Sequence, residues 1–355
     1  MKAHARTRQG AAIALAALAG AALTACSTPA EAEVAAGVSS TRACVILPDS
    51  VSSPRWDQGD RPALDEAISD LGFEVEIGNA LGQARNYADI AKRQLAKGCG
   101  VMVLVDFEGA AADVVTAAKA QGAAVIAYER PLAGADYYVS FDNVEVGRLQ
   151  ARSILDGLAA SGTDPATARV VYLPGDDADG SSAMIAEGAL EVLSAAGVSP
   201  VAEAPGAWDR LAASAAVQAA IAANGGVDAV WAANDTNAIG AVIALDQSGL
   251  VVPVSGQDAT LEGLRNVLLG KQTSTVYKPY RVEAKATAQL IISILNGSPL
   301  ESATTLDDGT PYFTLDPVLV TADSIPAVVR AGDVSVSKLC AGDTAAACAS
   351  LGITP

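Results

Sequence analysis

Histidine is almost absent from this sequence of 355 residues, since His4 is the only one. His4 lies in an N-terminal segment, residues 1–25, that we interpret below as a cleaved signal, so we expect the mature protein to contain no histidine. Catalysis of the Ser/His/Asp or Cys/His type is thereby excluded, and a zinc or copper site is disfavoured. We therefore expect no cofactor, no metal site and no enzymatic activity.

Positive charge is also scarce. Lys and Arg number 23 against 40 Asp and Glu, which gives a formal net charge of −17. Cleavage after residue 25 would remove Lys2, Arg6 and Arg8 and no acidic residue, so the charge would move from −17 to −20. Nucleic acid and anionic lipid surfaces would repel such a chain, and neither is an expected partner.

The longest apolar run, "GAAIALAALAGAAL", follows the basic start of the chain and is too short to span a membrane comfortably. It is typical of a secretory signal. The following "LTAC" resembles the lipobox of bacterial lipoproteins, which implies that Cys26 is acylated and becomes the mature N-terminus. An ordinary signal peptide with an incidental cysteine is the alternative. Residues 26–41 are small and polar, as expected of a flexible tether.

Five cysteines divide into Cys26, which the lipid would use, and four others. An extracytoplasmic location is oxidising, and four cysteines permit two disulfides in three connectivities. Cys340 and Cys348 would close a small loop. Cys44 and Cys99 stand at equivalent starts of two apolar runs, so we expect a second bond between them. Buried free thiols are the alternative.

From residue 42 short Val/Ile/Leu-rich runs alternate with Ala-rich amphipathic runs, a pattern that indicates βαβ units. Helical runs end at glycines such as Gly72 and Gly98, which suit the left-handed cap position. A second series of the same kind begins near residue 145. The sequence therefore predicts an α/β protein with two Rossmann-like halves and parallel sheets.

Polar residues stand where five apolar runs stop: Arg130, Asp142, Asn234, Asp258 and Lys278. Ligands of parallel sheets bind outside the carboxyl ends of the strands. If two such sheets face each other, all five side chains point into one cleft. Any one of these residues, taken alone, is equally consistent with a helix cap.

The charges of this set are mixed, since Arg55, Arg130 and Lys278 oppose Asp142 and Asp258. Donors and acceptors with nearly cancelling charge suit a neutral molecule covered in hydroxyl groups. Aromatic residues make up only 4% of the chain, yet two of the three Trp, Trp56 and Trp208, are in loops. Indole faces pack against the apolar faces of sugar rings. Trp231 falls within a strand and is expected in the core.

Residues 43 to about 320 resemble the periplasmic D-xylose-binding protein family and its multiple-sugar-binding relatives, within the type I periplasmic binding proteins. The motifs are "PRW", "AYERPL", "YYVSFDNVEVGRLQ", "ANDTNAIGA", "SGQDATLEGL" and "TVYKP". The resemblance implies sugar hydroxyl contacts and two stacking indoles. The hydroxyl contacts fall on Arg55, Arg130, Asp142, Asn234, Asp258 and Lys278, with Asn143 beside them, and the indoles are Trp56 and Trp208.

This resemblance implies two lobes joined by a three-strand hinge, with crossings near Ser140, Lys278 and Gly297. The expected divisions are a signal peptide at 1–25, a tether at 26–41, a first lobe at 42–139 plus 279–298, and a second lobe at 140–278 plus 299–355. It also implies a monomer, held at the outer face of the cell membrane by its lipid, that delivers a xylose-like pentose or a glucose- or galactose-like hexose to the permease of an ABC importer.

One departure bears on which sugar is bound. Relatives usually carry an Asn pair before the second lobe's first helix, whereas this chain has Gly180 and Ser181 in "DDADGSSAM". A shorter side chain there would lose a hydrogen bond or relay it through water. The same acidic loop fails the calcium-binding EF-hand pattern, because Gly175 stands at its first position and Ala186 at its twelfth.

Three other functions share parts of this pattern. A sugar sensor that presents its ligand to a membrane receptor needs the same site as a transport protein. The ligand-sensing core of a transcription regulator would need a basic helix-turn-helix where this chain has its signal. A glycoside hydrolase would use paired carboxylates, for which Asp142 and Asp258 are the candidates, but neither stands in an apolar pocket that would raise its pKa.

Overall fold

The structure is a computed structural model that describes residues 41–298, 300–302 and 304–354. The predicted signal peptide, Cys26 and the tether up to residue 40 lie outside these residues. None of the helices in the described ranges is both long and apolar enough to cross a membrane.

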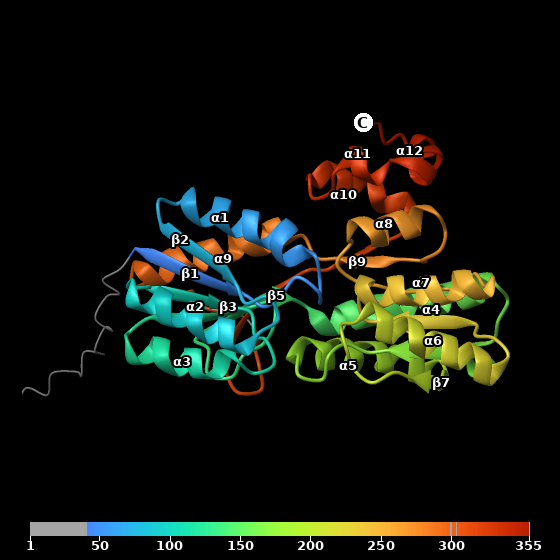
Figure 1. Cartoon of the computed structure of the whole chain (residues 1–355), viewed down its shortest axis with the longest axis horizontal. Coiled ribbons are helices and arrows are strands. Elements are labelled where there is room, and N and C mark those ends of the chain that lie inside the picture. The colour runs from blue at the N-terminus through green and yellow to red at the C-terminus, as the bar shows by residue number, and fades with distance from the viewer. Residues whose placement is uncertain (1–40, 299, 303, 355) are drawn as a thin grey trace, which may run out of the picture. The chain divides into compact units, whose positions relative to one another are not determined.

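A seven-stranded sheet forms the first lobe, with the strand order β10-β11-β5-β4-β3-β1-β2 (Figure 1). All neighbours are parallel except β10 and β11. The strands are β1 (Arg42–Leu47), β2 (Glu74–Asn79), β3 (Val101–Leu104), β4 (Ala124–Tyr128), β5 (Tyr137–Phe141), β10 (Thr304–Thr305) and β11 (Pro311–Leu315).

Helices cover both faces of this sheet, which explains why its central strands β1, β3 and β4 are apolar without alternation. In β1, Cys44 and Ile46 pack in a core with α2 (Ala84–Ala96) and α3 (Ala111–Ala120). Val45 and Leu47 point to the opposite face and pack with α1 (Arg61–Ser69) and α9 (Tyr280–Leu295). The segments that follow the carboxyl ends of β1 and β4 carry the residues of this lobe that line the site described below.

The second lobe repeats this layering around a smaller parallel sheet with the order β7-β6-β8. Helices α4 and α5 cover one face, and α6 and α7 cover the other. Single bridges, Val230 with Val254 and Gln257 with Val276, continue the sheet toward β9. The elements are α4 (Asn143–Ala160), β6 (Val170–Leu173), α5 (Gly180–Ala195), β7 (Pro200–Glu203), α6 (Arg210–Asn224), β8 (Ala229–Ala232), α7 (Asp235–Ser248), α8 (Leu261–Leu268) and β9 (Thr275–Tyr277), with a 3-10 turn at Pro165–Thr167.

The chain passes between the lobes at three places, and the third is not the one we expected. After α9 the chain stays in the first lobe, where β11 pairs in parallel with β5. It crosses only after Leu315, because β12 (Val318–Val320) pairs antiparallel with β9. The expectation that the chain crosses near Gly297 and that all of 299–355 belongs to the second lobe was therefore wrong for residues 304–315. One apolar run, "PYFTLDPVLV", is split at Asp316 and Pro317 between two sheets.

The last residues form a cap over α8 and β9. The cap contains a 3-10 turn at Ala322–Ser324, α10 (Ile325–Ala331), α11 (Val336–Leu339), a second 3-10 turn at Gly342–Thr344 and α12 (Ala345–Ser350). It shares an apolar core with Leu264, Val267 and Tyr277 of the second lobe. Arg265 of α8 fastens it by donating to the carbonyls of Lys338 and Leu339 at 3.0 and 3.1 Å.

Both expected disulfides are present. Cys44 in β1 is bonded to Cys99, which precedes the neighbouring strand β3, with 5.9 Å between their Cα atoms. Cys340 is bonded to Cys348 within the cap. The first bond staples two adjacent strands of the large sheet, and the second closes the turn between α11 and α12.

Candidate functional site

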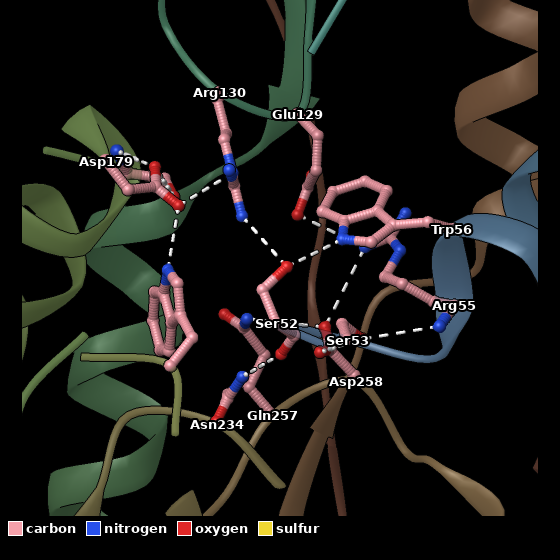
Figure 2. A pocket seen from close by; sticks show the side chains of 12 residues that line it. Ser52, Ser53, Arg55, Trp56, Glu129, Arg130, Asp179, Asn234, Gln257 and Asp258 are labelled. Carbon is pink, nitrogen blue, oxygen red and sulfur yellow. Dashed lines mark hydrogen bonds and ion pairs between the residues drawn. The ribbon is translucent and has the colours of Figure 1, made fainter. Parts of the chain in front are cut away.

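A polar pocket lies at the carboxyl ends of the strands and takes side chains from both lobes (Figure 2). The first lobe contributes the loop after β1, the short π-helical turn η1 (Trp56–Asp60) and the end of β4. The second lobe contributes the loops after β6, β7 and β8 and the segment before α8. The lining residues are Ser52, Ser53, Arg55, Trp56, Glu129, Arg130, Asp179, Ser181, Trp208, Asn234, Gln257 and Asp258.

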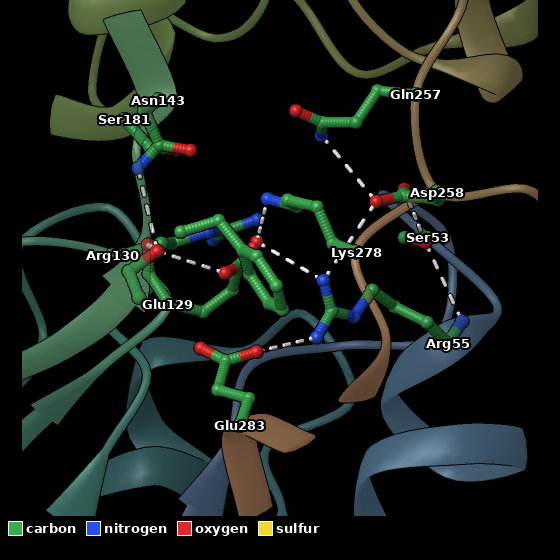
Figure 3. Close-up of polar contacts among 12 residues, drawn as sticks. Ser53, Arg55, Glu129, Arg130, Asn143, Ser181, Gln257, Asp258, Lys278 and Glu283 are labelled. Carbon is green, nitrogen blue, oxygen red and sulfur yellow. Dashed lines mark hydrogen bonds and ion pairs between the residues drawn. The ribbon is translucent and has the colours of Figure 1, made fainter. Parts of the chain in front are cut away.

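Six of the nine predicted ligand contacts belong to this lining: Arg55, Trp56, Arg130, Trp208, Asn234 and Asp258. Lys278 lies just behind it and reaches Glu129 (Figure 3). The remaining two, Asp142 and Asn143, are not part of the lining. The strand-end pattern therefore brings most of the predicted residues together.

Arg55 occupies the floor of the pocket and is almost completely engaged by carboxylates. Its Nε and Nη2 donate to the two oxygens of Asp60 at 2.7 and 2.8 Å. Nη2 also donates to Glu283 at 2.8 Å, and Nη1 donates to Glu129 at 3.1 Å. These contacts use four of the five guanidinium N–H groups. The remaining one is on Nη1, which stands 3.9 Å from Oδ1 of Asp258 across the cleft.

The floor is a buried charge cluster, and its pKa values reflect this. Burial alone would lower the pKa of Arg55, but Asp60, Glu129 and Glu283 outweigh it and hold that pKa well above its usual value. Burial would raise the pKa of Glu129, yet Lys278 and Arg55 together lower it to about 2. Glu129 is therefore a fixed anion that holds both cations in place.

Trp56 and Arg130 form one wall of the pocket on the first lobe. The guanidinium carbons of Arg55 and Arg130 each lie 5.4 Å from the centre of the Trp56 ring, within the range of cation–π attraction. Ser52 links this wall, since its Oγ accepts from Trp56 Nε1 at 2.9 Å and from Arg130 Nη2 at 3.3 Å. The indole is 3% exposed, and these contacts fix its orientation in this structure.

Asp179 organises the opposite wall on the second lobe. It caps α5 by accepting from the backbone N–H of Ser181 at 2.9 Å. Its other oxygen accepts from Trp208 Nε1 at 3.1 Å and pairs with Arg130 Nε at 2.8 Å. One carboxylate thus orients the second indole and also joins the lobes. The hydroxyl of Ser181 donates to Asp179 Oδ1 at 2.6 Å.

Asn234 and Asp258 bring the second lobe against the loop after β1. Asn234 caps α7 through its Oδ1 and donates from Nδ2 to the Ser52 carbonyl at 3.1 Å. Asp258 accepts from Ser53 Oγ at 2.8 Å. The φ angle of Asp258 is 95°, a costly conformation for a residue with a side chain, so its surroundings must hold it there.

Asp235 supplies much of that support. It accepts from the backbone N–H of Thr260 at 2.8 Å and from Gln272 at 2.9 Å, which fixes the loop that carries Asp258. Burial raises the pKa of Asp235 to about 7, with Asp258 adding to the rise, while the hydrogen bonds from Gln272 and the Thr260 backbone oppose it.

Asp142 and Asn143 lie at the start of α4, just after β5, and are not in the pocket lining. Asp142 caps α4 by accepting from the Glu145 backbone N–H at 2.9 Å. Asn143 is fully buried and donates to the hydroxyls of Tyr138 and Ser140 at 3.1 and 3.3 Å. Its Oδ1 has no hydrogen-bond partner among the described residues. A helix cap was the alternative interpretation of each strand-end residue, and Asp142 does form such a cap in this structure.

Sequence reasoning missed residues that hold the predicted ones. Glu129 sits one position before Arg130 in the quoted motif, and Asp179 one before Gly180. Both acids could have been expected near the site, because a buried Arg or Lys needs carboxylates nearby. Ser52 and Ser53 fall between the first strand and "PRW", in a loop that the strand-end argument should have included.

The two walls almost touch in this structure. The pocket is a cavity of about 20 Å³, room for only one or two water molecules. A ligand as large as a monosaccharide would have to separate the lobes and replace contacts such as Ser53 with Asp258 and Arg130 with Asp179. The side chains present offer it carboxylates, guanidinium groups, amides and two indoles. Within the described residues no group of three His, Cys, Asp or Glu is arranged to hold a metal ion.

Comparisons with known proteins agree with this architecture. The family described as a periplasmic binding protein domain matches residues 44–299. The D-xylose-binding periplasmic protein of Escherichia coli (strain K12) is 32% identical over 291 residues, which cover 78% of this chain and 86% of the relative. The protein of the same name from Haemophilus influenzae is 31% identical over 286 residues, covering 77% and 84%.

Among solved structures, an ABC transporter solute binding protein from Clostridium phytofermentans with bound β-D-glucose matches with a TM-score of 0.75 and 25% identity. That match covers 84% of this chain and 99% of the other. Two α/β lobes with parallel sheets, three crossings and a polar pocket at the strand ends are the type I periplasmic binding protein fold. The chain belongs to the periplasmic binding protein family.

Proposed function

We propose that this protein binds a monosaccharide between its lobes and delivers it to the permease of an ABC importer. The observation that carries the proposal is the pocket lining, in which Trp56 and Trp208 stand with Arg130, Asn234 and Asp258. Indoles provide flat apolar faces for a sugar ring, while the polar groups offer both donors and acceptors to its hydroxyls. The relatives named for D-xylose and the structure with β-D-glucose support a pentose or a hexose as ligand.

Binding without catalysis is part of this proposal. A hydrolase acting on a glycoside would need two carboxyl groups about the scissile bond. Asp142, the second candidate acid, caps α4 and does not line the pocket. The other two carboxylates that line the pocket beside Asp258 are Glu129 and Asp179, and they are paired with Lys278 and Arg130. We therefore expect no product from a nitrophenyl glycoside. Release of nitrophenol by the wild type and not by Asp258→Asn would favour the hydrolase instead.

Calorimetric titration against a panel of sugars tests the binding. The panel contains D-xylose, D-glucose, D-galactose, D-allose and myo-inositol, and the wild-type protein is compared with a Trp208→Ala variant. We expect one or more sugars to bind the wild type with a 1:1 stoichiometry and the variant more weakly, because ring stacking is lost. Absence of heat for every sugar, with the fold intact by circular dichroism, would refute the proposal.

The lipid anchor at Cys26 and the location at the outer face of the cell membrane remain part of the proposal, and the "LTAC" sequence supports them. Intact-mass analysis of protein extracted from membranes should find a diacylated N-terminal Cys26. A product that begins at another residue would contradict the anchor.

Uptake of radiolabelled sugar in a deletion strain separates transport from a sensing role, since a sensor is not needed for uptake. We expect a monomer by light scattering.

A further inference from the structure

Glu283 is a buried acid that the proposed function does not use. It lies in the first turn of α9, just after the hinge, and has no exposed surface. Its Oε2 accepts from Nη2 of Arg55 at 2.8 Å, as Figure 3 shows. Its Oε1 is buried and has no hydrogen-bond partner among the described residues. A carboxylate with an unpartnered oxygen in a dry interior is costly.

The charges around Glu283 make its ionisation more costly still. Two cations face it, Arg55 and Lys278, and both are already shared with the carboxylates of Asp60 and Glu129. Other titratable groups near the cluster are Tyr128, which donates to Asp60 at 2.6 Å, Tyr312 on β11, and Asp258 from the second lobe, 3.9 Å from Arg55. Burial also raises the pKa of Asp60, but the charge and hydrogen bonds of Arg55 and the hydrogen bond from Tyr128 oppose that rise. With Asp60 ionised and Glu283 neutral, Arg55 and Lys278 balance Asp60 and Glu129. With Glu283 ionised, three carboxylates oppose two cations before Asp258 arrives.

We propose that Glu283 is a neutral carboxylic acid that positions Arg55 under the pocket, and that its ionisation at higher pH weakens ligand binding. The first part concerns this chain alone. The second part rests on the proposed function, because it needs Arg55 to serve the ligand.

Arg55 is the link between the acid and the pocket. A neutral Glu283 accepts one hydrogen bond and leaves the Nη1 N–H facing Asp258 available. An ionised Glu283 would attract the guanidinium more strongly and would add a negative charge to the cluster that Asp258 must approach. Burial raises the pKa of Glu283 well above its usual value, and the charge of Glu129 adds to this, while Arg55 opposes it.

The direction of the pH effect follows from the raised pKa. A folded state that binds a proton more tightly than the unfolded state gains stability from it below the ordinary Glu pKa, and loses that gain as the pH rises through the raised pKa. Ligand affinity should fall in the same range, since the ionised form disfavours the approach of Asp258.

A Glu283→Gln variant keeps the shape and the acceptor but removes the titration. Glu66→Gln is the matched control, because Glu66 lies on α1 in the same lobe and makes an exposed ion pair with Arg281 of α9. Affinity for the sugar that binds wild type best, D-xylose or D-glucose, is measured calorimetrically across the neutral and alkaline range. We expect the affinity of wild type and Glu66→Gln to fall by at most about tenfold per pH unit above the raised pKa. The Glu283→Gln variant should not show that fall.

Carbon NMR of protein labelled at Glu carboxyl carbons tests the protonation without any sugar. We expect one signal, missing in Glu283→Gln, to titrate far above the ordinary Glu value of about 4.3. If that signal titrates at or below the ordinary value, the proposal is overturned. If that signal titrates far above the ordinary value and no sugar binds, the neutral state of Glu283 is supported and only the proposed function is refuted. If sugar binds and Glu283→Gln retains the wild-type pH dependence, the effect on binding is overturned.

Discussion

Two aspartates at the ends of strands offer a crossed test of the site. Sequence reasoning treated Asp142 and Asp258 alike, whereas the structure gives them different neighbours. Asp258 lines the pocket and accepts from Ser53 at 2.8 Å across the cleft. Among the described residues, the side chain of Asp142 accepts one hydrogen bond, from a backbone N–H at the start of α4. We predict that Asp258→Asn weakens sugar binding and that Asp142→Ala lowers stability.

The first prediction concerns the affinity for sugar, and the second concerns the stability of the fold. A hydrogen bond to a charged group contributes about 1.5–3 kcal/mol, so Asp258→Asn should weaken affinity by about 10- to 150-fold. Asparagine is the suitable replacement because it tolerates the φ of 95° at this position better than alanine does. Loss of an N-cap costs about 0.5–2 kcal/mol of stability. Asp142→Ala should lose that amount in urea unfolding and bind its sugar with nearly wild-type affinity.

Calorimetric titration and urea denaturation of both variants supply the four values needed. The reasoning would be refuted by the reverse result, in which Asp142→Ala loses affinity and keeps its stability while Asp258→Asn binds as the parent does. In that case Asp142, and not Asp258, would be the residue that meets the ligand.

The remaining predictions concern stability and closure. Replacing Cys44 and Cys99 by Ser should lower the free energy of unfolding by about 4 kcal/mol, from the entropy of closing a loop of 55 residues; an unchanged denaturation midpoint would contradict this. Gly180→Ala should disfavour the closed form without ligand, because its Cβ would lie 2.6 Å from Cγ of Pro131 on the other lobe, and it should not weaken sugar affinity, because the ligand must separate the lobes; a weaker affinity in calorimetric titration would contradict this. Asp333→Ala should lower the free energy of unfolding in urea by about 1.5–3 kcal/mol, because the buried side chain of Asp333 accepts hydrogen bonds from the Tyr277 hydroxyl and from Arg281 Nε; a loss below about 0.5 kcal/mol would contradict the importance of these bonds.

Much of the fold was predictable because buried parallel strands and amphipathic helices leave strong patterns. The return of β11 to the first sheet was not. Residues 311–320 read as one apolar run, and periodicity describes a strand without naming its partner. Only the pairing of Pro311–Leu315 with β5 and of Val318–Val320 with β9 shows where the run divides.

The site was predictable to the extent that its residues stand at strand ends. Arg130, Asn234 and Asp258 were found in this way, and all three line the pocket. Glu283 and Asp60 were not, because they lie on helical elements and meet Arg55 only through tertiary packing. Charge balance at a buried arginine indicates that acids must be near but does not say which of 40 acidic residues they are.

The late position of β11 in the chain has a consequence for how the protein is made. The first sheet begins with β1 at residue 42 but is filled beside β5 only when residues 311–315 have been synthesised. Until then β5 has an open apolar edge, the kind of surface that chaperones and proteases recognise and that aggregates. A nascent chain therefore cannot complete its first sheet until most of the chain has been synthesised. A product cut before residue 311 would keep that open edge, whereas one cut after residue 320 would lack only the cap.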